Sequence, residues 1–166
     1  AIKVASNQSG SSHYGVPKDT YFNSSYDTNA DRVITIPPNF ADTNYSHGQG
    51  KLDALLQTNM PNCQLAILLV NDLTDGGSDG FNKTAIASTG YESPEILTHE
   101  TGHVLANLGD EYTNAAPGFP NTEEPNTTQQ TNRLLIKWQA WISTSAPIPT
   151  TPPDSYPDVI GLFQGA

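Results

Sequence analysis

The distribution of apolar residues along the chain predicts several short strands. Residues 32–36 are rich in β-branched side chains and are closed by two prolines, which is typical of a strand with an abrupt end. Residues 64–70 are apolar without alternation, and such a run indicates a central strand covered on both faces. Residues 84–89 predict a short edge strand and residues 20–26 a further short strand, whereas the Gly- and Asp-rich segment 71–80 is expected to be a loop.

The same distribution predicts three helices. Residues 51–60 carry leucines at helical spacing and end before a proline. A second helix of about fifteen residues is bounded by Ser93 as N-cap and by Gly109 as C-terminal stop. A third helix is expected over residues 129–142, where the apolar residues that share one face are Leu134, Leu135, Trp138, Trp141 and Ile142.

This order of elements indicates an α/β or α+β fold. We expect a small, mostly parallel sheet with an antiparallel edge strand and with helices packed on it. A chain of 166 residues has the size of one compact domain, so a single domain over residues 1–166 is expected.

Composition and charge narrow the classes of partner. Seven Lys and Arg against seventeen Asp and Glu give a net charge of -10, which argues against a nucleic acid partner. No apolar run approaches the roughly twenty residues that a membrane-spanning helix needs. The polar, acidic and lysine-poor composition favours an exported protein. We also expect the protein to be a monomer.

The second predicted helix contains the pattern H-E-x-x-H at His99, Glu100 and His103. Histidines four residues apart lie on one face of a helix, so both imidazoles can reach a single zinc ion at about 2.0–2.1 Å. Glu100 is rotated by about 100° from His99 around the helix axis, so it can accept a proton from water beside the metal. The residues on the other side of this helix are apolar: Leu97, Val104, Leu105 and Leu108.

A catalytic zinc site usually has three protein ligands and a water, so the two histidines need a third partner. Asp110 is the first choice, because Gly109 can adopt a left-handed conformation that ends the helix and turns the next residue back toward the metal. The alternatives for this position are Glu111, Glu123 and Glu124. Tyr112 can donate a hydrogen bond to a developing oxyanion or pack against the helix end.

The stretch from His99 to Tyr112, HETGHVLANLGDEY, resembles the H-E-x-G-H-x-x-x-x-L-x-D-E-Y signature of the IgA peptidase family of zinc metallopeptidases. Further segments are similar to landmarks of that family, namely residues 69–71, 76–78, 124–126, 137–138 and 161–166. The resemblance spans most of the chain. It implies a zincin-like catalytic domain that cleaves peptide bonds and is exported from a bacterium.

Some features differ from the family pattern. Gln164 stands where the family typically has Glu, and the family's chain typically continues beyond this point. Met60 is the only methionine and precedes the zinc helix, so no methionine turn can lie below the metal in this segment. We therefore expect the catalytic domain either to be truncated at its C-terminus or to build the last part of its pocket differently.

The residues and the resemblance together predict a zinc-dependent metalloendopeptidase that uses a zinc-activated water and Glu100 as general base. Its substrate is a protein or peptide, which the edge strand at residues 84–89 can hold in extended form. The alternative is a secreted or surface binding module that retains a zinc site without catalysis. A third interpretation is a calcium loop, whose ligands would be Asn71, Asp72, Asp75 and Asp79.

Overall fold

The computed structural model describes all residues except 28–31, 40–41, 81, 111–122, 152–160 and 163–166. The described residues form two compact units, residues 1–106 and residues 107–166, and each unit is described by itself. The single domain expected from the length stays a prediction. Within the part of the chain that is described, no helix is both long and apolar enough to cross a membrane.

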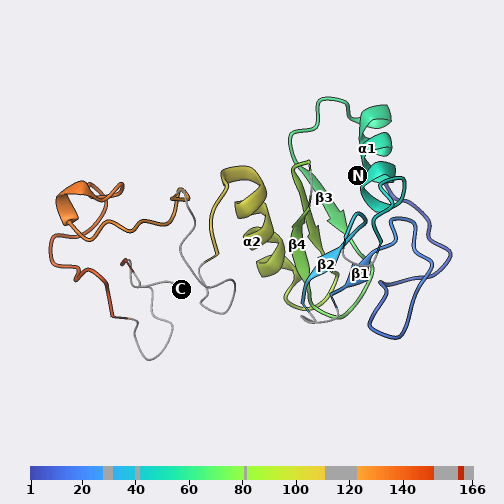
Figure 1. Ribbon diagram of the computed structural model, residues 1–166, viewed down its shortest axis with the longest axis horizontal. Coiled ribbons are helices and arrows are strands. Elements are labelled where there is room, and N and C mark those ends of the chain that lie inside the picture. Colours follow the sequence, from blue (N-terminus) through green and yellow to red (C-terminus); the bar gives the residue numbers. More distant parts are fainter. Residues whose placement is uncertain (28–31, 40–41, 81, 111–122, 152–160, 163–166) are drawn as a thin grey trace. The chain divides into compact units, whose positions relative to one another are not determined.

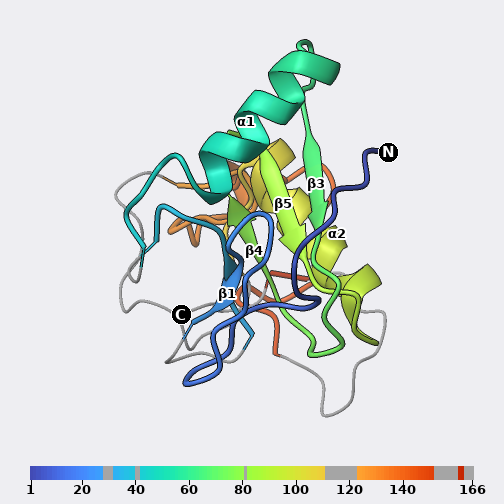
Figure 2. The ribbon, with the colours of Figure 1, turned by 90° about the vertical axis from the view of Figure 1, so that its right-hand side faces the viewer.

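The central feature of the first unit is a three-stranded mixed sheet (Figure 1), in which β5 lies between β3 and β4 (Figure 2). β3 (Ala66–Leu69) runs parallel to β5 (Thr84–Ala87), and β4 (Gly77–Gly80) runs antiparallel to β5. A mixed α/β fold with an antiparallel edge strand is therefore confirmed. Two assignments were wrong: residues 84–87 form the middle strand rather than an edge, and residues 77–80, expected in a loop, form an edge strand.

A second, two-stranded sheet pairs β1 (Ser25–Tyr26) with β2 (Ile34–Thr35) in antiparallel orientation. Both strands lie inside segments that were predicted to be strands. The Gly77 N–H donates to the carbonyl of Arg32 at 2.8 Å, so the start of β4 is hydrogen-bonded to the segment that leads into β2.

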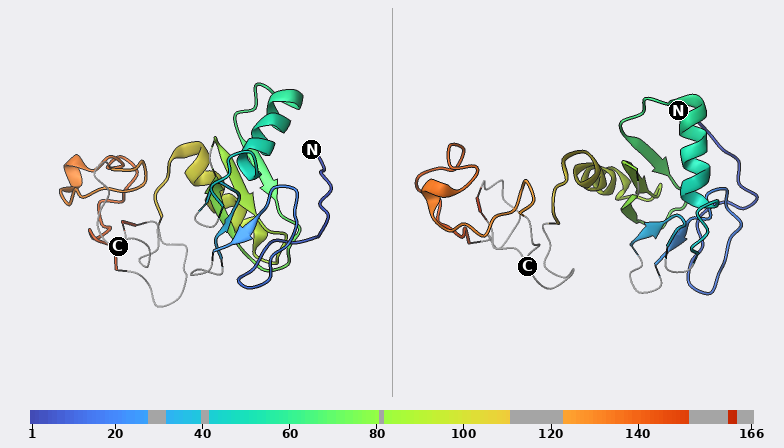
Figure 3. Two further views of the ribbon diagram at one scale, coloured as in Figure 1. Left: turned by 45° about the vertical axis from the view of Figure 1, so that its right-hand side comes forward. Right: turned by 45° about the horizontal axis from the view of Figure 1, so that its top comes forward.

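Two helices flank the three-stranded sheet from opposite sides, α1 (Gly48–Asn59) on one and α2 (Ser93–Ala106) on the other (Figures 1 and 3). Both were predicted, with slightly different ends. α2 packs across β4 and β5. Because successive side chains of a strand alternate between faces and Ile86 belongs to the core on the α1 side, its neighbours Ala85 and Ala87 face α2. Their small side chains let the helix lie close to the sheet.

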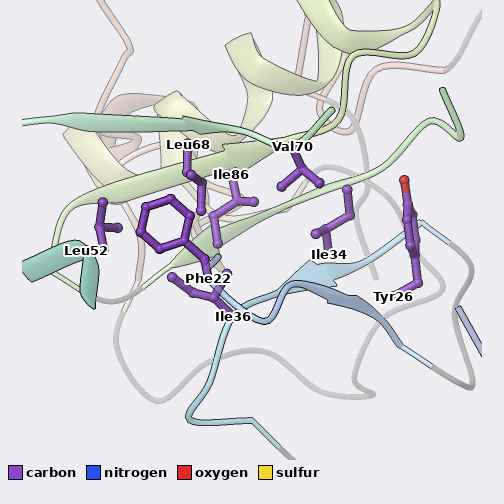
Figure 4. Packing of buried hydrophobic residues seen from close by; sticks show 8 residues of the cluster. All are labelled: Phe22, Tyr26, Ile34, Ile36, Leu52, Leu68, Val70 and Ile86. Atoms are coloured by element: carbon purple, nitrogen blue, oxygen red, sulfur yellow. The ribbon is translucent and has the colours of Figure 1, made fainter. Parts of the chain in front are cut away.

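The hydrophobic core of the first unit lies between one face of the sheet and the two short strands (Figure 4). Its members are Phe22, Tyr26, Ile34, Ile36, Leu52, Leu68, Val70 and Ile86. Along β3 the burial alternates, because Leu68 is 8% exposed and Leu69 is 56% exposed. The expectation that residues 64–70 form a central strand covered on both faces is therefore wrong: β3 is an edge strand, and α2 packs on the other two strands.

The loop between β3 and β4 is fixed by the buried carboxylate of Asp72. It accepts hydrogen bonds from the N–H groups of Ser11 at 2.9 Å and Thr74 at 3.0 Å, and a ring nitrogen of His13 lies 3.2 Å away. Burial raises the pKa of Asp72, but these hydrogen bonds outweigh it, so its pKa lies below the ordinary value. Asp75 accepts a backbone hydrogen bond of 2.7 Å from the residue before α2. Both carboxylates serve the fold, which leaves the calcium-loop interpretation without support.

The second unit departs most from the sequence expectation. Instead of a helix over residues 129–142 it contains one turn of 3-10 helix, η1 (Arg133–Leu135). The Arg133 guanidinium donates to the carbonyls of Ser143 and Ala146, so the chain turns back after η1. Trp141, expected in a buried face, is 86% exposed, whereas Ile136 is 1% exposed. The prediction of a helix over residues 129–142 is therefore wrong. The hydrogen bonds that order this segment run from the Arg133 side chain to backbone carbonyls and are not the backbone hydrogen bonds of an α-helix.

Candidate metal centre

Hydrogen bonds anchor the start of α2 to the end of β5. The Ser93 hydroxyl donates to the carbonyls of Ser88 and Gly90, both at 2.8 Å. Ser93 is the first residue of α2 and its hydroxyl caps no helix N–H, so the N-cap role predicted for it was wrong. Arg32 forms an ion pair with Glu92, one residue before the helix. These contacts fix the direction in which α2 leaves the sheet. They thereby also fix where the H-E-x-x-H residues of the helix lie relative to the sheet.

His99, Glu100 and His103 bring their ligand atoms together, and these atoms all lie within 4.8 Å of one another. Nε2 of His103 lies 2.9 Å from Nε2 of His99, and the two rings are nearly perpendicular, with centroids 4.4 Å apart. His99 is exposed and His103 is partly buried. Among the described residues, no other three His, Cys, Asp or Glu side chains converge in this way.

This set of donors fits a zinc ion. Zinc binds imidazole nitrogen and carboxylate oxygen at about 2.0–2.2 Å. Two nitrogens at that distance and at a tetrahedral angle are separated by roughly 3.3 Å. The separation of 2.9 Å between the two Nε2 atoms is close to that value. The two imidazoles can therefore share one ion, with Glu100 beside it.

A glycine on the neighbouring strand makes room for this part of α2. A Cβ atom on Gly77 would lie 2.4 Å from Cγ2 of Ile96, 2.7 Å from the carbonyl oxygen of Ile86 and 3.2 Å from Cγ of Glu100. The first two distances are below 3.0 Å, a separation that real Cβ atoms essentially never show. The helix thus rests on the backbone of β4, and this contact sets the distance of Glu100 from the sheet.

We expect Gly77→Ala to lower the free energy of unfolding by about 1–3 kcal/mol, because the added methyl group must push α2 away from β4. Urea denaturation measures this loss. Gly80→Ala on the same strand is the matched control, since its Cβ would come no closer than 3.2 Å to any atom and would not meet α2. Equal stability of the wild type and Gly77→Ala would contradict the close packing of helix and strand.

The end of α2 differs from the sequence expectation. The helix ends at Ala106, and the left-handed residue after it is Asn107, with a φ of 51°. Gly109 is not among the glycines with positive φ; a Cβ atom there would lie 1.6 Å from Oε2 of Glu124. The role given to Gly109 was wrong, because Asn also tolerates the left-handed region and stands nearer to the helix end. Gly109 instead permits the close approach of Glu124.

The remaining predicted site residues lie in the second unit or outside the described residues. Asp110 is described, as an exposed residue of the second unit. Glu111 and Tyr112 lie outside the described residues. Glu123 is one of the alternatives to Asp110 as third ligand. Its carboxylate is already engaged in an ion pair of 2.9 Å with Lys137. The third ligand stays a prediction.

Two residues, one in each unit, received no role from the sequence. Gly77 stood in a predicted loop, and its signals were the glycine pair at residues 76–77 and the similarity of residues 76–78 to a family landmark. Asn126 exchanges two hydrogen bonds with Gly109, of 2.7 Å and 2.9 Å. The only signal for it is that residues 124–126 are similar to a family landmark, which says nothing of its partner.

The chain is similar to a known protein family. Residues 7–160 match the family model described as IgA Peptidase M64. The matched range includes α2 with its two histidines, Asp110 and Asn126. No curated protein matches the chain. The resemblance that the sequence indicated is therefore confirmed.

Proposed function

Because the chain belongs to the IgA Peptidase M64 family, we propose that it is a zinc-dependent metalloendopeptidase that hydrolyses peptide bonds in protein or peptide substrates. The family match supports a metallopeptidase in general. The observation that carries the proposal of zinc is the convergence of the His99 and His103 rings, whose Nε2 atoms lie 2.9 Å apart beside Glu100. We further propose that the protein is secreted or displayed on a bacterial cell surface and acts as a monomer.

Each residue of the site has one role in this proposal. His99 and His103 hold the ion, with Asp110 as the third ligand. When bound, zinc polarises the scissile carbonyl and lowers the pKa of a water molecule. Glu100 takes a proton from water while the water oxygen bonds to the carbonyl carbon, and it returns the proton to the leaving nitrogen as the C–N bond breaks. Tyr112 donates a hydrogen bond to the oxyanion.

The binding place for an extended substrate must differ from the one that the sequence suggested. Residues 84–87 cannot accept a further strand, because β5 is already paired on both sides. The sheet edge next to α2 is β4, and its first residue, Gly77, is hydrogen-bonded to Arg32. An extended peptide that adds to this edge would pair beyond Gly77, at Asp79, whose backbone groups point in the same direction as those of Gly77.

Removal of the metal tests the proposed activity. The purified chain is incubated with an unstructured peptide, and the products are identified by mass spectrometry. We expect cleavage that a zinc chelator abolishes and that added zinc restores. Cleavage that continues in the chelator would contradict a zinc peptidase. A chain that binds zinc and cuts no peptide would favour the alternative, a binding module without catalysis.

A further inference from the structure

In the second unit, the side chain of Asn126 holds the residue that precedes Asp110. Its Oδ1 accepts a hydrogen bond of 2.7 Å from the Gly109 N–H, and its Nδ2 donates one of 2.9 Å to the Gly109 carbonyl. The peptide unit is planar, so the direction of the Gly109 carbonyl also fixes the plane that contains the nitrogen and Cα of Asp110. One amide side chain therefore restrains the backbone on both sides of Gly109.

The lack of a side chain at Gly109 allows the turn that carries Asn126 to approach its backbone closely. It is buried, whereas Asp110 is exposed. A Cβ atom on Gly109 would lie 1.6 Å from Oε2 and 2.4 Å from Cδ of Glu124, so no larger residue fits while this side chain keeps its position. The segment before Asp110 thus lies directly against the turn that carries Asn126.

The turn that carries Asn126 is itself fixed. The Thr127 N–H donates to the Glu124 carbonyl at 3.2 Å, and the Glu124 N–H donates to the Thr127 hydroxyl at 3.1 Å. Lys137 donates to the carbonyls of Glu124 and Thr127, both at 2.8 Å, and forms an ion pair with Glu123. These contacts hold the backbone of the turn that carries Asn126, so the Asn126 side chain starts from a fixed position.

We propose that Asn126 is a positioning residue for the metal centre, which acts by holding the Gly109 peptide groups so that Asp110 is presented as a zinc ligand. This inference rests on the proposed function, in which Asp110 is the third ligand. Residues that orient a ligand without touching the metal typically contribute about 10–100-fold to metal affinity. Asn126 acts on the backbone of the ligand segment rather than on the carboxylate.

A double-mutant cycle on zinc affinity tests the inference. Zinc affinity is measured by competition with a chromophoric chelator for the wild type, Asn126→Ala, Asp110→Ala and the double variant. We expect Asn126→Ala to weaken zinc binding by about 10–100-fold. We expect no further loss when Asn126→Ala is added to Asp110→Ala, because Asn126 acts only through Asp110.

Asn132→Ala is the matched control. It removes the side-chain hydrogen bond that caps η1 in the same unit, and zinc affinity should stay at the wild-type value. Thermal melting of the metal-free proteins shows whether each variant is folded. Where Asn126→Ala fails to fold, Asn126→Asp takes its place in the cycle, because it keeps the acceptor for the Gly109 N–H and loses the donor to the Gly109 carbonyl.

The outcomes separate this inference from the proposed function. Unchanged zinc affinity in Asn126→Ala, or an equal loss with and without Asp110, would overturn the positioning role. If Asp110→Ala itself leaves zinc affinity unchanged, the assignment of the third ligand in the proposed function fails, and the positioning role fails with it. A loss in Asp110→Ala together with no loss in Asn126→Ala overturns the inference alone.

Discussion

Replacement of Glu100 by Gln is expected to lower kcat for peptide hydrolysis by about 10²–10⁴-fold while zinc stays bound. Gln has nearly the same shape as Glu, but its amide cannot take a proton from water. The measurement is kcat with an unstructured peptide, together with the zinc content of the same sample.

Glu95→Gln is the matched control for that variant. Glu95 lies in the first turn of the same helix and is exposed. The control makes the same chemical change without removing the general base, so kcat should stay near the wild-type value. A Glu100→Gln variant that retains wild-type kcat would eliminate Glu100 as the base and would require another proton acceptor.

Replacement of His103 by Ala is expected to weaken zinc binding by more than the roughly 10–100-fold that is typical when only a supporting residue is lost. One of the two converging nitrogens disappears, so the remaining imidazole has no partner one helical turn away. His99→Ala should have the same effect for the same reason. The measurement is zinc affinity by competition with a chelator of known affinity.

His47→Ala is the control for the histidine variants. His47 precedes α1 and its Nδ1 lies 2.8 Å from the carboxylate of Asp42. This substitution removes a histidine that is engaged elsewhere, so zinc affinity should not change. Wild-type zinc affinity in both His99→Ala and His103→Ala would place the metal at another site.

The helix α2, which carries the candidate metal ligands, could be predicted from the sequence because its signals are local. The spacing of His99 and His103 fixes their common face, and the start of the helix at Ser93 follows from residues that are adjacent in the chain. The convergence of the two Nε2 atoms needed no information about the rest of the fold.

The order of the strands could not be predicted in this way, because strand pairing depends on residues far apart in the chain. The residues of β4, Gly-Ser-Asp-Gly, have low strand propensity, and their pairing with β5 makes them a strand. The apolar run at residues 64–70 indicated burial on both faces. It could not reveal that α2 would cover β5 and β4 and leave Ile67 half exposed.

The segment after α2 shows a different limit. The periodicity of Leu134, Trp138 and Trp141 favours a helix, but Asn132 and Arg133 bind backbone groups and turn the chain after Leu135. Side-chain hydrogen bonds to the backbone compete with helix formation, and periodicity carries no information about them. The same holds for Asn126, whose partner Gly109 lies 17 residues earlier in the chain.

The most direct test of the metal centre is an anomalous difference map at the zinc absorption edge from a crystal of the chain grown with zinc. We predict one strong peak within coordination distance of Nε2 of both His99 and His103, with a third protein oxygen at the same peak. A map with no peak between these two rings, or with the rings turned apart and the zinc bound elsewhere, would contradict the account.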